Sequence, residues 1–286
     1  MFIPRNVLEE KLRQLLAEDV GQGDATSAAV VPAGLTVDAA IVSKEAGVAA
    51  GIEETTILAE SLRLSVKAEV ADGEKIRNRQ TVMKISGDAQ TILSAERTIL
   101  NLLSRMSGIA TATRRLIEKL QKANLTAKIA ATRKTAPGLS FFDKKAVLVG
   151  GGDPHRLRLD DLILIKDNHV AIAGSVENAL KRAKQAASFS KKIEAEVTST
   201  ADAMKAAEAG ADIVMLDNFS PSQVEETVEA LKKAGYFGKV LLEVSGGVTE
   251  QNILDYASAQ VDVISMGALT HSVKALDVSL EIAEVK

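Results

Sequence analysis

The feature that most constrains the fold of this chain is a series of short apolar runs that alternate with helical segments in its second half. Six such runs occur, at residues 128–131, 162–165, 193–197, 212–216, 240–244 and 261–265. Strands of this length that are separated by helices are typical of parallel βα units. Six of them indicate a β/α barrel, incomplete beside the usual eight strands, rather than an open sheet.

The first hundred residues show a different pattern. Apolar residues at helical spacing between Val7 and Leu16 predict an amphipathic helix, and runs at 35–42 and 64–70 predict strands. A long helical pattern then runs from Ser94 to Gln121. Because 286 residues suffice for about two domains, we expect a small α+β domain at residues 1–103 and a TIM-like β/α barrel at 104–271.

Composition excludes several classes of protein. A net charge of -3 and 3% aromatic residues without tryptophan disfavour nucleic-acid binding. No apolar stretch is long enough to cross a membrane, so we expect a cytoplasmic protein with no membrane partner. The absence of cysteine excludes thiol nucleophiles and disulfides, and only three histidines are present. Any bound metal should therefore be a hard cation with oxygen ligands.

Polar or small residues stand at or just after the ends of five predicted strands. They are Lys166, Glu196, Asp217, Ser245 and Gly267. A β/α barrel gathers its active site at the carboxyl ends of its strands, so these residues should face one pocket. Glu196 and Asp217 offer acceptor oxygens for a divalent cation or for ribose hydroxyls; pairing with nearby lysines is the alternative.

Glycines follow the last two predicted strands, where barrels often bind phosphate. Glycine permits close backbone approach, and free N–H groups at the next helix attract an anion. The alternative is a pair of turns that only cap helices. The predicted phosphate cup consists of Ser245, Gly246, Gly247, Gly267, Ala268 and Leu269, with His271 nearby.

Cationic residues gather in three places beside the expected pocket, at 132–135, 155–158 and Lys166. Guanidinium groups bind carboxylates through two hydrogen bonds, and lysine supplies a point charge for phosphate. We therefore expect a strongly anionic ligand, with a solvated basic surface as the alternative. Gly150, Gly151 and Gly152 fit neither a dinucleotide nor a nucleoside triphosphate motif. His169 has no clear assignment, and a structural role at the start of a helix is favoured over a role as a ligand.

Several motifs along the chain together resemble one known family, the quinolinate phosphoribosyltransferases. They lie at residues 18–26, 96–103, 107–111, 132–138, 150–156, 165–169, 215–218 and 245–247. The resemblance implies an α/β domain followed by an incomplete barrel, with a C-terminal helix at 272–286 packed back on the first domain. It also implies a dimer with shared active sites, in which Arg97 reaches the neighbouring pocket, and a hexamer is a further option.

The resemblance also implies the reaction and the role of each site residue. Quinolinate and phosphoribosyl pyrophosphate would give nicotinate mononucleotide, pyrophosphate and carbon dioxide in NAD biosynthesis, with Mg²⁺ or Mn²⁺ as cofactor. Lys134, Lys166, Glu196 and Asp217 would be catalytic, and Glu196 and Asp217 would hold the metal, partly through substrate and water. The quinolinate site would be Arg97, Thr132, Arg133, His155, Arg156 and Lys166. The phosphoribosyl site would be Lys134, Glu196, Asp217 and the phosphate cup with His271.

Three other functions remain open at this stage. A paralogue linked to molybdenum transport would share the barrel and many phosphoribosyl-binding residues, although Arg97, Arg133, His155 and Arg156 favour the biosynthetic enzyme. A non-catalytic phosphate-binding barrel would bind phosphoribosyl pyrophosphate without turnover. A barrel aldolase would need an uncharged Lys166 among other charged groups.

Overall fold

The computed structural model describes residues 3–286, which form two compact units. The first unit contains the chain up to Arg114, together with Phe141–Gly151 and Val273–Lys286, and the second contains Arg115–Ser140 and Gly152–Ser272. The predicted boundary between residues 103 and 104 therefore falls inside a helix. Residues 141–151, which the sequence assigned to the barrel, belong to the first unit.

The first unit is built on a four-stranded antiparallel sheet with the order β12, β1, β5 and β3. These strands are β12 (Val278–Val285), β1 (Thr36–Ser43), β5 (Thr81–Asp88) and β3 (Ser65–Ala68). A separate two-stranded sheet pairs β2 (Gly47–Val48) with β4 (Lys75–Ile76). In β1 the side chains alternate, with Val37, Ala39 and Ile41 buried, as expected of a sheet with one covered face.

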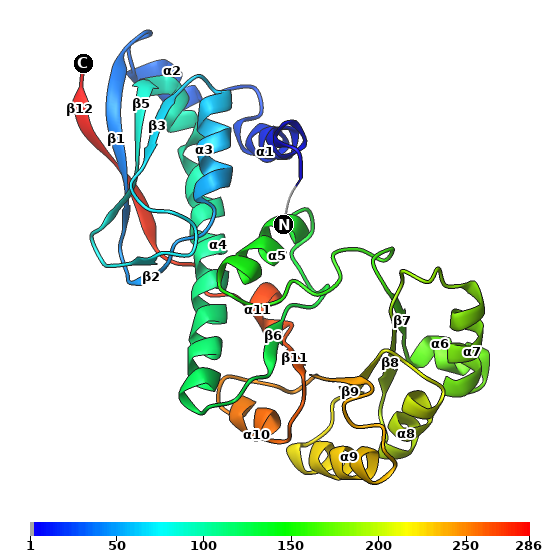
Figure 1. The fold of residues 1–286 in the computed structure, drawn as a ribbon. Coiled ribbons are helices and arrows are strands. Elements are labelled where there is room, and N and C mark those ends of the chain that lie inside the picture. Colours follow the sequence, from blue (N-terminus) through cyan, green and yellow to red (C-terminus); the bar gives the residue numbers. More distant parts are fainter. Residues whose placement is uncertain (1–2) are drawn as a thin grey trace. The chain divides into compact units, whose positions relative to one another are not determined.

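The helices of the first unit are α1 (Arg5–Val20), α2 (Ala25–Val30), α3 (Ile52–Ser61), most of α4 (Ala89–Lys122) and nearly all of α5 (Ser140–Val149). Figure 1 shows α3 and α4 running alongside the four-stranded sheet. Helix α4 buries one apolar stripe, including Ile99, Leu103 and Met106, which matches the helical spacing predicted for this segment. At Gly108 a side chain would collide with the backbone of Lys274, so a glycine lets the C-terminal segment approach the helix.

The C-terminal segment is a strand, and the predicted helix at 272–286 is wrong. Residues Val278, Leu280 and Ile282 alternate with polar residues, which is the two-residue period of a strand. Strand β12 pairs antiparallel with β1, from Ser43 opposite Val278 to Val37 opposite Val285. The pairing satisfies backbone groups that β1 would otherwise expose along its edge.

The second unit contains a six-stranded sheet in which every neighbouring pair is parallel. Its order is β6 (Lys128–Ala130), β11 (Val263–Ser265), β10 (Leu241–Ser245), β9 (Ile213–Asp217), β8 (Ile193–Val197) and β7 (Ile163–Ile165). All six predicted strands are present. Because β6 and β7 are the two edges, the barrel is not closed, which confirms the incomplete barrel.

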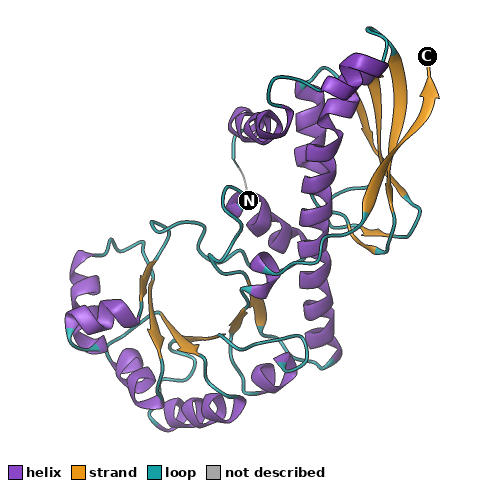
Figure 2. Ribbon diagram, turned by 180° about the vertical axis from the view of Figure 1, so that it is seen from behind, coloured by secondary structure: helices purple, strands orange, loops and turns teal. Residues whose placement is uncertain are grey.

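Helices connect the parallel strands along one side of the sheet. They are α6 (Asp167–Ala173), α7 (Val176–Ala186), α8 (Thr200–Glu208), α9 (Pro221–Lys233) and α10 (Ile253–Ser258), while the short α11 (Ala268–His271) follows the last of these strands, β11. Figure 2 shows the sheet curving inside an arc formed by α6 to α10, which cover its outer side. In the part of the chain that the structure describes, no helix combines the length and the apolar character needed to cross a bilayer.

Candidate active site

The register of the parallel sheet places the polar strand ends in one layer. Asp217 of β9 lies opposite Ser245 of β10, which lies opposite Ser265 of β11. One layer deeper, Met215 lies beside both Glu196 of β8 and Glu243 of β10. Because side chains two residues apart in a strand share a face, these residues all point to the inner side of the curved sheet.

A cavity of about 470 Å³ opens at this end of the sheet. Its lining contains ten of the residues predicted for the site, which are Thr132, Arg133, Lys134, His155, Arg156, Lys166, Glu196, Asp217, Ser245 and Gly246. They come from four strand ends and from the loops after β6 and before β7. The structure thus brings the cationic and the acidic residues into one pocket, rather than onto separate surfaces.

The remaining predicted residues lie outside that lining. Gly267 is adjacent to it, since a side chain there would come within 3.1 Å of Lys134 Cδ. Leu269 is buried, with 3% of its surface exposed, so only its backbone could meet a ligand. The imidazole of His271 pairs with the Ser272 hydroxyl at 2.6 Å. Arg97 is exposed on α4 in the first unit.

Lys166 and Glu196 form an ion pair inside the cavity. Lys166 Nζ donates to Glu196 Oε2 at 2.5 Å, and the glutamate side chain is 12% exposed. Pairing with a lysine, the alternative raised for the two carboxylates, is therefore present for Glu196. Its other oxygen is not part of this contact, so the carboxylate can still accept from a ligand.

Asp217 is held by its neighbour Asn218, which the sequence did not single out. Asn218 Nδ2 donates to Asp217 Oδ2 at 2.7 Å, and Asn218 N–H donates to the Ser245 carbonyl at 2.8 Å. This arrangement requires glycine at position 246, where φ is +84° and a Cβ atom would lie 2.3 Å from Asn218 Oδ1. The glycine of the predicted phosphate cup therefore also makes room for the amide that orients Asp217.

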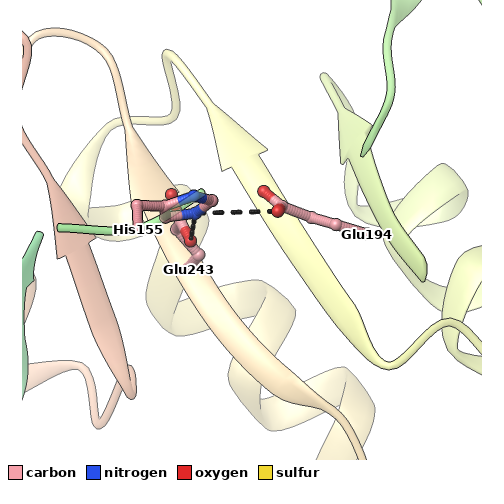
Figure 3. A group of neighbouring side chains, drawn as sticks. All are labelled: His155, Glu194 and Glu243. Atoms are coloured by element: carbon pink, nitrogen blue, oxygen red, sulfur yellow. Dashed lines mark hydrogen bonds and ion pairs between the residues drawn. The ribbon is translucent and has the colours of Figure 1, made fainter. Parts of the chain in front are cut away.

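His155 occupies a tight turn before β7, with φ at +53°, the left-handed region that is rare for a residue with a side chain. Its backbone N–H donates to Asp153 Oδ1 at 2.7 Å, and its Nδ1 accepts from the Arg156 N–H at 2.8 Å. On the other side of the ring, Nε2 lies 3.0 Å from Glu243 Oε2 and 3.6 Å from Glu194 Oε2. Figure 3 shows both carboxylates directed at this nitrogen.

Glu194 and Glu243 are the acidic residues that sequence reasoning missed. Both side chains are almost completely buried, at 0% and 1% exposed. Burial, and next the charge of Glu243, raise the pKa of Glu194 to about 7. The sequence did carry a signal, because each glutamate interrupts an apolar run that forms a buried strand.

Positive charge is also concentrated in the lining of the cavity, at Arg133 and Arg156. The pKa of Arg156 is lowered, first by burial and then by the nearby charge of Arg133. Two guanidinium groups that crowd each other in this way gain from a shared anionic ligand, which relieves their repulsion. The cavity therefore combines an anion-binding wall with a carboxylate-bearing floor.

Two groups of side chains in the described residues could hold a metal ion by proximity, and both have another explanation. In the first group, His155 Nδ1 accepts a hydrogen bond, so the proton of the neutral ring lies on Nε2 and that nitrogen cannot be a ligand. In the second group, Lys145 already pairs with Glu53 and Glu54. Glu196 and Asp217, with one oxygen each outside the contacts described above, better fit a hydrated Mg²⁺.

Comparison with known proteins gives a consistent result over nearly the whole chain. The model of the quinolinate phosphoribosyl transferase N-terminal domain matches residues 24–107, and that of the C-terminal domain matches residues 109–281. The chain is 48% identical to a probable nicotinate-nucleotide pyrophosphorylase (carboxylating) of Methanothermobacter thermautotrophicus, covering 96% of this chain and 99% of that protein. It is 41% identical to the human nicotinate-nucleotide pyrophosphorylase (carboxylating), covering 89% and 85%.

Solved structures agree with these relatives. The nicotinate-nucleotide pyrophosphorylase from Francisella tularensis superposes with a TM-score of 0.89 at 35% identity, covering 99% of this chain and 98% of that one. A deletion mutant of NadC superposes with a TM-score of 0.91, also at 35% identity, covering 100% and 99%. The similarity includes both units, so the fold and the sequence motifs point the same way.

Proposed function

This chain belongs to the quinolinate phosphoribosyltransferase family, and we propose that it joins quinolinate to phosphoribosyl pyrophosphate in the cavity of its parallel sheet. The products are nicotinate mononucleotide, pyrophosphate and carbon dioxide, in the de novo synthesis of NAD. The observation that carries the assignment is one cavity that holds Arg133, Arg156 and Lys166 together with Glu196 and Asp217. Such a cavity suits a dicarboxylate beside a polyhydroxylated phosphate ester.

The cationic wall would bind quinolinate. Arg133 and Arg156 can each grip a carboxylate through two hydrogen bonds, and Thr132, His155 and Lys166 lie in the same lining. Arg97 would complete the site from a second subunit, which makes a dimer the functional form in this proposal. Further assembly to a hexamer and a cytoplasmic location belong to the same proposal.

The carboxylate-bearing side would bind phosphoribosyl pyrophosphate. Glu196 and Asp217 would accept hydrogen bonds from the ribose hydroxyls, and Lys134 would face the pyrophosphate. The phosphate would accept hydrogen bonds from the backbone N–H groups of Ser245 and Gly246. The rest of the proposed phosphate site would be Gly247, Gly267, Ala268 and Leu269, with His271 nearby. Mg²⁺ or Mn²⁺ held near Glu196 and Asp217 would neutralise charge on the leaving pyrophosphate.

The chemistry follows from charge and position. As the bond from ribose to pyrophosphate breaks, an oxocarbenium-like carbon forms, and the pyridine nitrogen of quinolinate attacks it. The cavity contributes by holding the two reactants in contact, so no protein nucleophile is needed. Once the ring nitrogen is cationic, the adjacent carboxylate leaves as carbon dioxide, and the electron pair of the broken C–C bond stays on the ring carbon. A proton from solvent then bonds to that carbon in place of the carboxylate.

The ion pair of Lys166 with Glu196 argues against the aldolase alternative. An imine-forming lysine must offer a free lone pair, whereas Lys166 Nζ is bound to the carboxylate as a hydrogen-bond donor at 2.5 Å. The paired ammonium is suited instead to binding an anion.

The direct experiment is to incubate the purified protein with quinolinate, phosphoribosyl pyrophosphate and Mg²⁺ and to follow nicotinate mononucleotide. We expect turnover with quinolinate and little with nicotinic acid, which lacks the second carboxylate. Arg156→Ala should raise the KM for quinolinate far more than the KM for phosphoribosyl pyrophosphate. Equal use of the two acids would contradict the proposal, and binding of phosphoribosyl pyrophosphate without product would favour a non-catalytic barrel.

A further inference from the structure

We propose that Glu243 is a positioning residue for the proposed function: by accepting a hydrogen bond from His155, it fixes the turn that presents Arg156 to the quinolinate carboxylates. Glu243 lies on β10 and lines the same cavity as both residues. Nothing in the proposed reaction assigns it a contact with a reacting atom. Its role would be exerted through His155.

The hydrogen bonds of His155 determine which ring nitrogen carries the proton. Nδ1 accepts from the Arg156 N–H at 2.8 Å, so it has no proton of its own. The proton of the neutral ring is therefore on Nε2, which donates to Glu243 Oε2 at 3.0 Å. One imidazole thus links a buried carboxylate on the sheet to the peptide that carries Arg156.

The turn needs such support because its backbone is strained. A left-handed conformation at a residue with a side chain costs about 1 kcal/mol or more, and it persists only where surrounding contacts hold it. Contacts that do so at His155 include those with Asp153 Oδ1, the Arg156 N–H and Glu243. Glu243 alone among these three partners lies outside the turn, in the rigid sheet.

The position of Glu243 is costly, which points to a role in function rather than in stability. A carboxylate that is 1% exposed in the middle of an apolar strand loses its hydration, and its Oε1 has no hydrogen-bond partner among the described residues. Glu194, fully buried beside it, adds repulsion. Replacing buried charged groups with apolar residues often leaves a protein as stable or makes it more stable. A role in stability alone therefore does not explain the buried Glu194 and Glu243.

Glu194 provides a matched comparison within the same cluster. It has the same side chain and nearly the same burial, but its oxygen lies 3.6 Å from Nε2, which is beyond hydrogen-bonding distance. If burial of a glutamate at this place alone mattered, both residues would contribute equally. If the hydrogen bond positions His155, Glu243 should matter more.

The test compares Glu243→Met, Glu243→Gln and Glu194→Met in the full-length enzyme. Loss of the charge-assisted hydrogen bond predicts a rise of about tenfold or more in the quinolinate KM for Glu243→Met, where tenfold is equivalent to about 1.4 kcal/mol. The KM for phosphoribosyl pyrophosphate should stay within about twofold of its original value, a change equivalent to well under 1 kcal/mol. Glu243→Gln retains an acceptor oxygen, so its quinolinate KM should stay close to that of the original protein. Glu194→Met should raise the quinolinate KM less than Glu243→Met does.

A second readout does not depend on activity. The chain has only three histidines, so nitrogen-15 spectra of histidine-labelled protein can be assigned with the His155→Asn variant. We expect the neutral Nε2–H tautomer for His155 in the original protein, and its loss or mixing in Glu243→Met. The exposed Glu229→Gln change, on α9, serves as a control that should alter neither readout.

Three results would overturn the inference. They are an Nδ1–H tautomer in the original protein, equal effects of Glu243→Met and Glu194→Met on the quinolinate KM, and a metal ion bound to the protein that Glu243→Met releases. Because the tautomer is read without substrate, it tests the contact even if quinolinate is not turned over. Failure of the proposed function and failure of this contact can therefore be told apart.

Discussion

The two units each bury a glutamate beside a second acidic residue, and they balance the charge in different ways. In the first unit, fully buried Glu54 pairs with Lys145 at 2.5 Å, and Lys145 also contacts Glu53. In the second unit, fully buried Glu194 lies beside Glu243, and both carboxylates face the imidazole of His155. One cluster contains an ammonium group, whereas in the other the partner is a histidine ring.

The pKa values reflect this difference. Burial raises the pKa of Glu54, and the charge of Lys145 is the largest influence that opposes the rise. Burial also raises the pKa of Glu194, but there the next largest influence, the charge of Glu243, acts in the same direction and brings the value to about 7. In the first cluster the cation thus offsets part of the cost of burial, whereas in the second the neighbouring carboxylate adds to that cost, a pattern that is common at functional sites.

The largest expected effect is loss of the lysine in the first cluster. Lys145→Met would leave Glu54 buried without its cation, which typically destabilises a protein by about 3–5 kcal/mol. Denaturant unfolding should show this loss. Lys274→Met is the control, because that lysine is 86% exposed and its pair with Glu45 should contribute about 0–1 kcal/mol. Similar losses in the two variants would break the contrast between the clusters.

The second-largest effect is a dependence of the unfolding free energy on pH that we expect from Glu194. Its folded pKa of about 7 exceeds the ordinary 4.5, so the native state holds the proton more tightly than the unfolded state. This tighter binding of the proton adds about 3 kcal/mol to the unfolding free energy below about pH 4.5. The contribution declines between about pH 4.5 and 7 and is lost above pH 7. Glu194→Gln should remove this decline in unfolding free energy. An unchanged pH profile would show that Glu194 is not the group responsible.

A smaller effect is expected when the nearby guanidinium is removed. The charge of Arg156 lowers the pKa of Glu194, so Arg156→Ala should move that pKa further above 7. The decline in unfolding free energy would then extend to higher pH, and the variant's pH-dependent contribution would differ by about 1 kcal/mol or less. Measurement of unfolding free energy between pH 6 and 9 would detect the shift, and a shift to lower pH would contradict the electrostatic picture.

The smallest effect should come from the second carboxylate on Lys145. Glu53 is 58% exposed, unlike Glu54, although both contact the same ammonium group. Solvent screening limits such a pair to about 0–1 kcal/mol. Glu53→Gln should therefore barely change the unfolding free energy, and a loss as large as that of Lys145→Met would mean that exposure is a poor guide here.

Local patterns predicted much of the fold and of the site. The six parallel strands were evident from the apolar runs, and Lys166, Glu196, Asp217 and Ser245 were recognised from their places at strand ends. The C-terminal helix was predicted wrongly because resemblance outweighed the two-residue alternation of Val278, Leu280 and Ile282. Asn218 was missed because its role depends on the close approach to Gly246, which has no local signal.

The sequence by itself determined the class of the protein, since strand periodicity, residue types at strand ends and family motifs are properties of short segments. Only the tertiary structure decided which side chains meet. Glu194 and Glu243 are 49 positions apart in the printed sequence, yet strand register and the turn at His155 direct both at one imidazole. The energy of such contacts depends on burial and distance across strands, and those quantities exist only once the chain is folded.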